Sequence, residues 1–71
     1  MNADTYARLR ALRDEAVAAG DSAQAELCDV ATGYRTFAYR REAGRRVRVG
    51  RRQALDLCLE ALAAADAQRE A

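Results

Sequence analysis

The sequence predicts an all-α fold, an antiparallel helical hairpin plus a third helix, similar in outline to a three-helix bundle. Half of the hydrophobic residues are alanine, apolar residues recur at helical spacing in three segments, and the sequence has no proline. Alanine favours helix because it loses no side-chain entropy, but it buries little surface. The 71 residues are therefore expected to form one small helical domain, residues 1–71, with a thin core.

The first helix is predicted over residues 4–19. Asn2 or Asp4 is a suitable N-cap, and Gly20 is a suitable stop because glycine adopts a left-handed terminal conformation easily. Asp21 or Ser22 then opens the second helix. Because the junction between the two helices is short, we expect them to pack as an antiparallel hairpin.

The second helix is predicted over residues 22–43, with a possible break at Gly33. Its apolar stripe of Leu27, Val30, Tyr34 and Phe37 continues past that glycine, which favours an unbroken helix. A glycine inside a helix costs only about 1 kcal/mol relative to alanine. The alternative is that the helix ends at Gly33 and that residues 34–41 form a further short helix.

Residues 44–50 are predicted to be an Arg-rich connection between two glycines. Val47 and Val49 alternate around Arg48, which suggests a loop or a short extended piece, since one strand cannot be stable alone. The third helix is predicted over residues 51–69. Its apolar face is wide enough to pack on two neighbours or to form the seam of a homodimer.

All twelve basic residues are arginines, and charge is distributed unevenly along the chain. Residues 1–34 carry three arginines against six acids, a net charge of −3, and residues 53–71 carry one against four, also −3. Residues 35–52 carry eight arginines against Glu42 alone, a net charge of +7. Such asymmetry indicates an electrostatic partner. The alternative is that the arginines pair with acids of the same chain or of a dimer mate.

The arginines of the segment 40–52 are the candidate contacts to that partner. The planar guanidinium fork suits phosphate or carboxylate, and several arginines together can contact several phosphates. A neighbouring aromatic ring can stack on an unpaired base. The candidate site residues are Arg40, Arg41, Arg45, Arg46, Arg48, Arg51, Arg52 and Tyr39, whereas Tyr34 and Phe37 are assigned to the core.

Two functions fit these residues. The first is a small non-enzymatic protein that contacts nucleic-acid phosphates with little sequence specificity, because no known nucleic-acid-binding fingerprint is present. The second is a protein–protein interaction module, or an inhibitor of a host protein complex, whose arginines hold an acidic protein surface.

The composition argues against other classes of function. The chain has no histidine, the most common general acid or base, so we expect no enzyme. Cys28 and Cys58 form no CxxC pair, so we expect free thiols and neither a metal site nor a cofactor. No small-molecule substrate and no membrane partner are expected, and a cytoplasmic location is the default.

A short pattern around each cysteine, an acid, leucine, cysteine, two residues and alanine, occurs twice with an offset of 30 residues. Chance among leucine-rich helices is one explanation. The alternative is that the two cysteines pack together where their helices cross.

The run Leu9 to Asp21, followed by Leu27-Cys28-Asp29 and Ala31, resembles small helical-hairpin proteins of phages, plasmids and bacterial genomes with the pattern LRDEAxxAGD…LCDxA. The resemblance covers residues 5–33 and 54–65, and the Arg-rich segment looks inserted between these parts. It implies a helical hairpin and a mobile-element accessory protein, but no activity.

Overall fold

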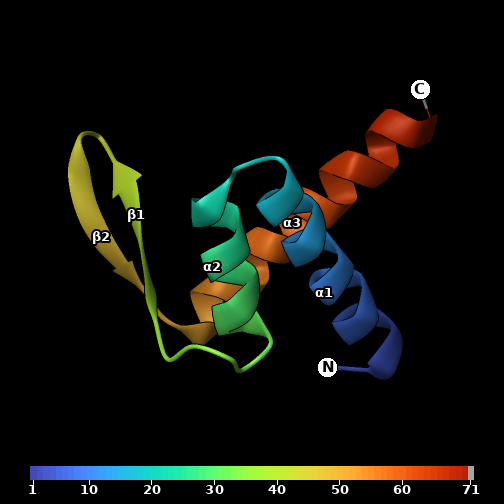
Figure 1. The fold of residues 1–71 in the computed structure, drawn as a ribbon, viewed down its shortest axis with the longest axis horizontal. Helices are drawn as coiled ribbons and strands as arrows, with labels where there is room; N and C mark the ends of the chain where they lie inside the picture. The colour runs from blue at the N-terminus through green and yellow to red at the C-terminus, as the bar shows by residue number, and fades with distance from the viewer. Residues whose placement is uncertain (71) are drawn as a thin grey trace.

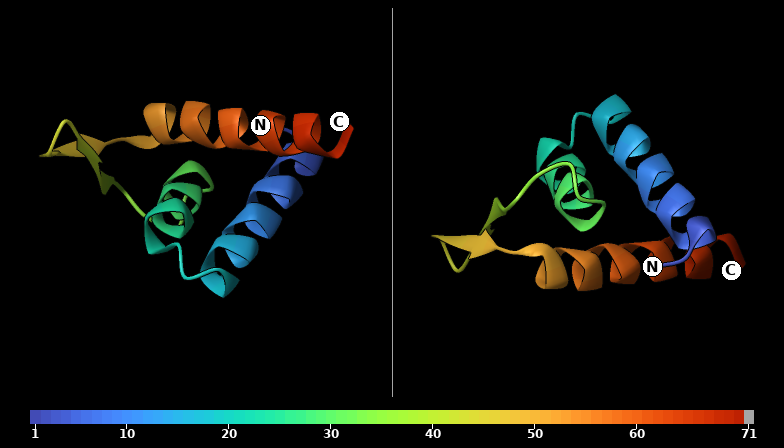
Figure 2. Two further views of the ribbon diagram at one scale, coloured as in Figure 1. Left: turned by 90° about the horizontal axis from the view of Figure 1, so that it is seen from above. Right: turned by 90° about the horizontal axis from the view of Figure 1, so that it is seen from below.

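Three helices form a triangle, and a β-hairpin projects from one of its corners (Figures 1 and 2). The computed structural model describes residues 1–70. The elements are α1 (Ala3–Ala18), α2 (Ser22–Ala31), β1 (Ala38–Glu42), β2 (Arg45–Val49) and α3 (Arg51–Glu70). The mostly helical fold is confirmed, but the all-α prediction is wrong in residues 38–49, where β1 and β2 pair in a two-stranded antiparallel sheet.

The starts of α1 and α2 follow the local sequence signals. The Thr5 backbone N–H donates a hydrogen bond to Asn2 Oδ1 at 2.8 Å, and the Gln24 backbone N–H donates to Asp21 Oδ1 at 3.1 Å. Each bond satisfies a backbone donor that has no partner inside its helix. Asn2 and Asp21 are therefore the N-caps, and Gly20 follows the end of α1, as expected.

The end of α2 contradicts the predicted helix over residues 22–43. Gly33 has a φ of +89°, its N–H donates to the Val30 carbonyl at 3.2 Å, and the Tyr34 N–H donates to the Asp29 carbonyl at 2.8 Å. These two bonds form a Schellman motif, which satisfies the last carbonyls of the helix and turns the chain away. Tyr34 is then 64% exposed, so the apolar stripe that favoured continuation does not extend past Gly33.

Of the two alternatives for residues 44–50, a loop or a short extended piece, the structure shows the extended one: residues 45–49 are β2, the second strand of a hairpin. Ala38 pairs with Val49, and the register runs to Glu42 opposite Arg45, which leaves Ala43 and Gly44 as a two-residue turn. Both turn residues have positive φ, +50° and +77°. Two successive positive φ values define the type I′ turn, whose twist matches that of antiparallel strands. Residues 38–42, predicted to be helical, supply the partner strand that β2 needs.

The core lies between the helices and the base of the hairpin, and most of its residues are small. Leu9, Val30 and Val49 are the largest fully buried aliphatic side chains, one each from α1, α2 and β2. The remaining buried members of the cluster are Leu27, Cys28, Ala31, Ala38, Ala54 and Cys58. The core is thin, as expected from the composition. Small residues allow helices to approach closely, which compensates for the small buried surface of each side chain.

We predict that Gly33→Ala lowers the free energy of unfolding by about 1 kcal/mol, because an L-residue is strained at a left-handed φ. Space is not the reason, since an added Cβ would meet only Arg51 Nη2, at 3.8 Å. Gly50→Ala is the matched control, because Gly50 has no positive φ and open space around it. Urea denaturation measures both variants, and equal losses in the two would contradict this account of Gly33.

Ala43→Asn is predicted to raise the free energy of unfolding by about 0.5–1 kcal/mol. Asparagine tolerates the left-handed region better than alanine and is preferred in type I′ turns. Thermal and urea unfolding measure the change. Gly44→Ala should act in the opposite direction, because it places a side chain at φ +77°. Destabilisation by Ala43→Asn would argue against the type I′ turn.

Candidate functional site

The hairpin divides its arginines between two faces, because side chains alternate along a strand. In the register of β1 and β2, Tyr39 lies opposite Arg48 and Arg41 lies opposite Arg46, on one face. The other face holds the pairs Ala38–Val49, Arg40–Val47 and Glu42–Arg45. Ala38 and Val49 are buried, so this second face packs on the helices at its base and leaves the first face exposed.

On the exposed face, two arginines lie over two aromatic rings. The Arg46 guanidinium carbon is 3.9 Å from the ring centroid of Tyr39, and that of Arg48 is 4.5 Å from the centroid of Phe37. The two rings meet edge to face with centroids 5.4 Å apart. We call Phe37, Tyr39, Arg41, Arg46 and Arg48 the arginine–aromatic face. Cation–π contact of this kind holds a guanidinium in place without neutralising it.

One cross-strand pair on this face is electrostatically unfavourable. Arg41 and Arg46 are directly opposite each other, and like charges in that position destabilise a sheet. Closer to the turn, Glu42 faces Arg45 and also lies 3.6 Å from Arg40 Nε. The one carboxylate of the hairpin therefore lies on the other face, and among residues 1–70 neither Arg41 nor Arg46 forms an ion pair.

The three arginines of α1 and Arg35, which follows α2, have acidic partners within the chain. Arg8 forms an ion pair with Asp66 at 2.6 Å, and Arg10 forms one with Asp29 at 2.7 Å. Arg13 and Arg35 also pair with acids, at 3.2 and 3.4 Å. Within residues 1–70, no ion pair is formed by Arg41, Arg45, Arg46, Arg48 or Arg51. Ion pairing within the chain therefore accounts for the arginines of α1 and for Arg35. Among the described residues it accounts neither for the exposed side of the hairpin nor for Arg51 and Arg69 of α3.

The predicted site residues Arg51 and Arg52 lie outside the hairpin, in the first turn of α3. The Arg52 side chain is 90% exposed, and its Nε lies 4.0 Å from Asp56 Oδ2. A long, exposed ion pair of this kind contributes little to stability. A Cβ at Gly33 would lie 3.8 Å from Arg51 Nη2, which places this guanidinium beside the C-terminal end of α2. Positive charge is favourable there, so Arg51 also has a structural role.

The eight predicted site residues are thus brought to one end of the molecule but not to one surface. Arg41, Arg46, Arg48 and Tyr39 share the arginine–aromatic face, whereas Arg40 and Arg45 lie on the opposite face of the hairpin. The sequence interpretation missed Phe37, which it assigned to the core and which instead lies under Arg48. The two-residue spacing of Phe37 and Tyr39, matched by that of Arg46 and Arg48, was the available signal.

Cys28 and Cys58 are in contact where α2 and α3 cross, so the second of the two explanations for the repeated pattern fits the structure. Both thiols are free and fully buried, with sulfur atoms 3.8 Å apart, and Gln24 Nε2 lies 3.6 and 3.7 Å from them. The hydrogen bond donated by Cys58 lowers the pKa of Cys28 to about 7, and giving that bond raises the pKa of Cys58. Because burial keeps reagents away from both sulfurs, the pair serves packing.

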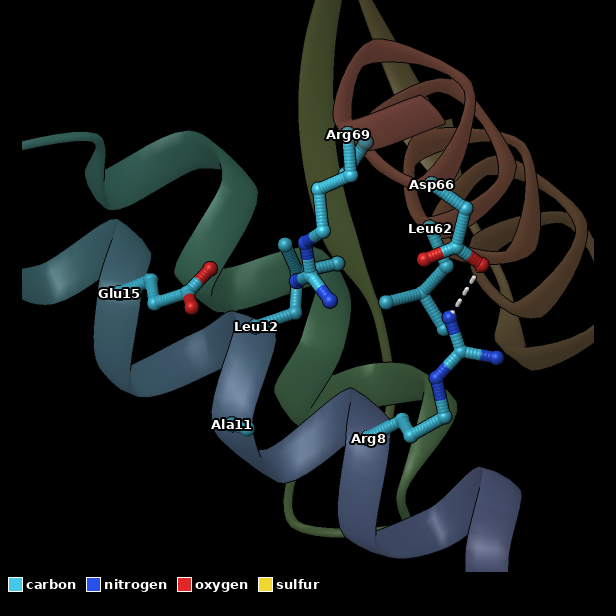
Figure 3. A pocket seen from close by; sticks show the side chains of 8 residues that line it. Arg8, Ala11, Leu12, Glu15, Leu62, Asp66 and Arg69 are labelled. Carbon is cyan, nitrogen blue, oxygen red and sulfur yellow. Dashed lines mark hydrogen bonds and ion pairs between the residues drawn. The ribbon is translucent and has the colours of Figure 1, made fainter. Parts of the chain in front are cut away.

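A hollow lies between α1 and α3, away from the hairpin (Figure 3). Its volume is about 170 Å³, and Leu12, Leu62 and Ala65 are among its apolar lining residues. The ion pair of Arg8 with Asp66 spans one side of it. Pockets for small molecules usually measure about 300–1,000 Å³, so this hollow is too small to be a strong candidate.

No family model, curated protein or solved structure matches this chain. Over the residues that the structure describes, none of the helices combines the length and the apolar character needed to cross a membrane. Within the same residues, no cluster of three or more histidine, cysteine or acidic side chains is arranged to hold a metal ion. The hairpin is the strongest candidate site because its exposed face groups three arginines with two aromatic rings.

We predict that Cys58→Ala raises the pKa of Cys28 from about 7 toward or above the ordinary thiol range, because the variant removes the donor that stabilises the thiolate. A pH titration of thiolate absorbance in the ultraviolet measures this shift. Cys28→Ala is the control: it removes the acceptor that raises the pKa of Cys58, so the pKa of that remaining thiol should fall. A pKa near 7 that persists in Cys58→Ala would contradict the assigned hydrogen bond.

Proposed function

We propose that this protein is a non-enzymatic nucleic-acid-binding protein that uses its hairpin to contact phosphates with little sequence specificity. The observation that carries the proposal is the separation of its arginines into two groups. Arg8, Arg10 and Arg13 of α1 form ion pairs with acids of the chain, whereas Arg41, Arg46 and Arg48 of the arginine–aromatic face form none among residues 1–70. Unpaired arginines grouped on one projecting element suit a polyanion.

The arrangement of these side chains supports an anionic ligand. An anion between Arg41 and Arg46 would remove the repulsion of the cross-strand pair. Arg46 and Arg48 are already held over Tyr39 and Phe37, so they lose less side-chain freedom when they bind. Phosphate contacts would therefore relieve the repulsion between Arg41 and Arg46. They would also use guanidinium positions that are already arranged in the free protein.

The surroundings of these arginines favour nucleic acid over an acidic protein surface. Protein interfaces usually have an apolar centre with a polar rim. Ala38 and Val49 of the hairpin are buried against the helices, and Val47 lies on the face opposite the arginine–aromatic face. That exposed face thus carries no aliphatic side chain, and each of its two aromatic rings has a guanidinium over it. What it presents is mainly the positive charge that phosphates require.

The same proposal includes a cytoplasmic location and a role as a mobile-element accessory protein. Both cysteines are free thiols, which agrees with a reducing compartment. Nucleic acid is abundant in that compartment. A homodimer is not required, because the hairpin arginines are presented by one chain.

Fluorescence anisotropy with labelled DNA at increasing salt tests the proposal. About five phosphate contacts predict a slope near −4.5 for log affinity against log salt on duplex, and Arg46→Gln should reduce the steepness by about one. Arg8→Gln is the matched control, because it makes the same charge change in an exposed pair between α1 and α3. Circular dichroism checks that both variants fold.

Three results would contradict the proposal. One is no binding to any nucleic acid at about 50 mM salt, where electrostatic binding is strong. Another is binding that does not change with salt. The third is an equal loss in Arg46→Gln and Arg8→Gln, which would mean that net charge acts and the hairpin does not. The first result would leave an acidic protein surface as the partner class.

A further inference from the structure

The shape of the hairpin and the state of its aromatic rings indicate which nucleic acid it binds. We infer that the ligand is double-stranded B-form DNA and that the hairpin enters the major groove as a two-stranded ribbon. This inference rests on the proposed function and adds the ligand class and the binding mode. Four features of the hairpin support it: its width, its reach, its covered rings and its arginines near the turn.

The hairpin is narrow because its sheet has two strands. Within residues 1–70 the sheet consists of β1 and β2 only, and it stands beyond the corner of the triangle of helices (Figure 2). Neighbouring strands are about 4.8 Å apart. A two-stranded ribbon of this kind fits the major groove of B-form DNA, about 12 Å wide, whereas the minor groove, about 6 Å wide, is too narrow.

The hairpin is also long enough to reach the floor of that groove. Each strand has five residues, which at about 3.4 Å per residue gives a reach near 17 Å. The major groove is about 8.5 Å deep. The half of the hairpin near the turn can therefore lie in the groove while its base, and Arg52 at the start of α3, stay near the phosphates.

Single-stranded ligands are disfavoured because a guanidinium already lies over one face of each ring that could stack on a base. Arg46 covers Tyr39 and Arg48 covers Phe37, and the edge of one of these rings meets the face of the other. Tyr34, in the segment between α2 and β1, is 64% exposed, and Arg10 lies over one face of its ring at 4.2 Å. Proteins that bind single strands instead present open aromatic faces to successive bases.

The arginines nearest the turn match the chemistry of the groove floor. Acceptors are present there in most sequences, namely guanine O6 and N7, adenine N7 and thymine O4, so a guanidinium finds one with little sequence specificity. Arg41 and Arg46 lie side by side across the strands and next to the pair that flanks the turn. Duplex RNA offers no equivalent, because its major groove is deep and too narrow for side chains to read.

The experiment compares four labelled ligands of equal length and related sequence at one salt concentration. They are duplex DNA, single-stranded DNA, duplex RNA, and a DNA duplex whose major groove is filled by bulky groups on C5 of its pyrimidines. We expect plain duplex DNA to bind about tenfold more tightly than each of the other three. A minor-groove ligand added as competitor should not displace the protein.

Arg46→Gln should lose about ten- to a hundredfold in affinity for plain duplex DNA and most of the discrimination against the filled groove. Arg8→Gln should keep both. Ala43→Asn, which retains every arginine and favours the turn, should bind at least as well as the unchanged chain.

The outcomes separate this inference from the proposed function. Equal or tighter binding to single-stranded DNA or duplex RNA, or no effect of the filled groove, would overturn the groove mode while leaving phosphate binding by the hairpin intact. Binding to none of the four ligands would overturn both.

Discussion

The end of α2 is the constraint on which the rest of the structure depends. The bonds from Gly33 and Tyr34 back to Val30 and Asp29 stop the helix after ten residues and direct the chain outward. Only then can residues 38–42 become a strand. That strand supplies the partner for residues 45–49, and the pairing sets which arginines share a face. A local backbone motif therefore determines the architecture of the candidate site.

The attachment of the hairpin to the helices is small and apolar. Ala38 and Val49 are buried at its base, directly opposite each other, while the residues toward the turn are mostly exposed. A two-stranded hairpin is only marginally stable by itself in water. Packing at the base and the cation–π contacts along the exposed face therefore both contribute to its stability. The contacts that stabilise the free hairpin are also the contacts that orient Arg46 and Arg48 for a ligand.

Much of the helical framework could be predicted because its signals are local. Asn2 and Asp21 lie within three residues of the backbone groups that they cap, and Gly20 follows its helix directly. The hairpin could not be predicted in the same way. Its turn is Ala43-Gly44, which lacks the asparagine or aspartate that usually marks a type I′ turn. In addition, Tyr34 and Phe37 are three residues apart and extend a helical stripe equally well.

The sequence by itself determined the positions of the helix starts, the concentration of arginines in one segment, and the small side chains of the core. Only the tertiary structure decided that this segment is a ribbon and which arginines are left without acidic partners. The physical reason is that strand pairing and ion pairs join residues far apart in the chain. Arg8 meets Asp66 and Arg10 meets Asp29 only because the helices fold together, whereas strand pairing places Arg41, Arg46 and Arg48 on a face that has no acid.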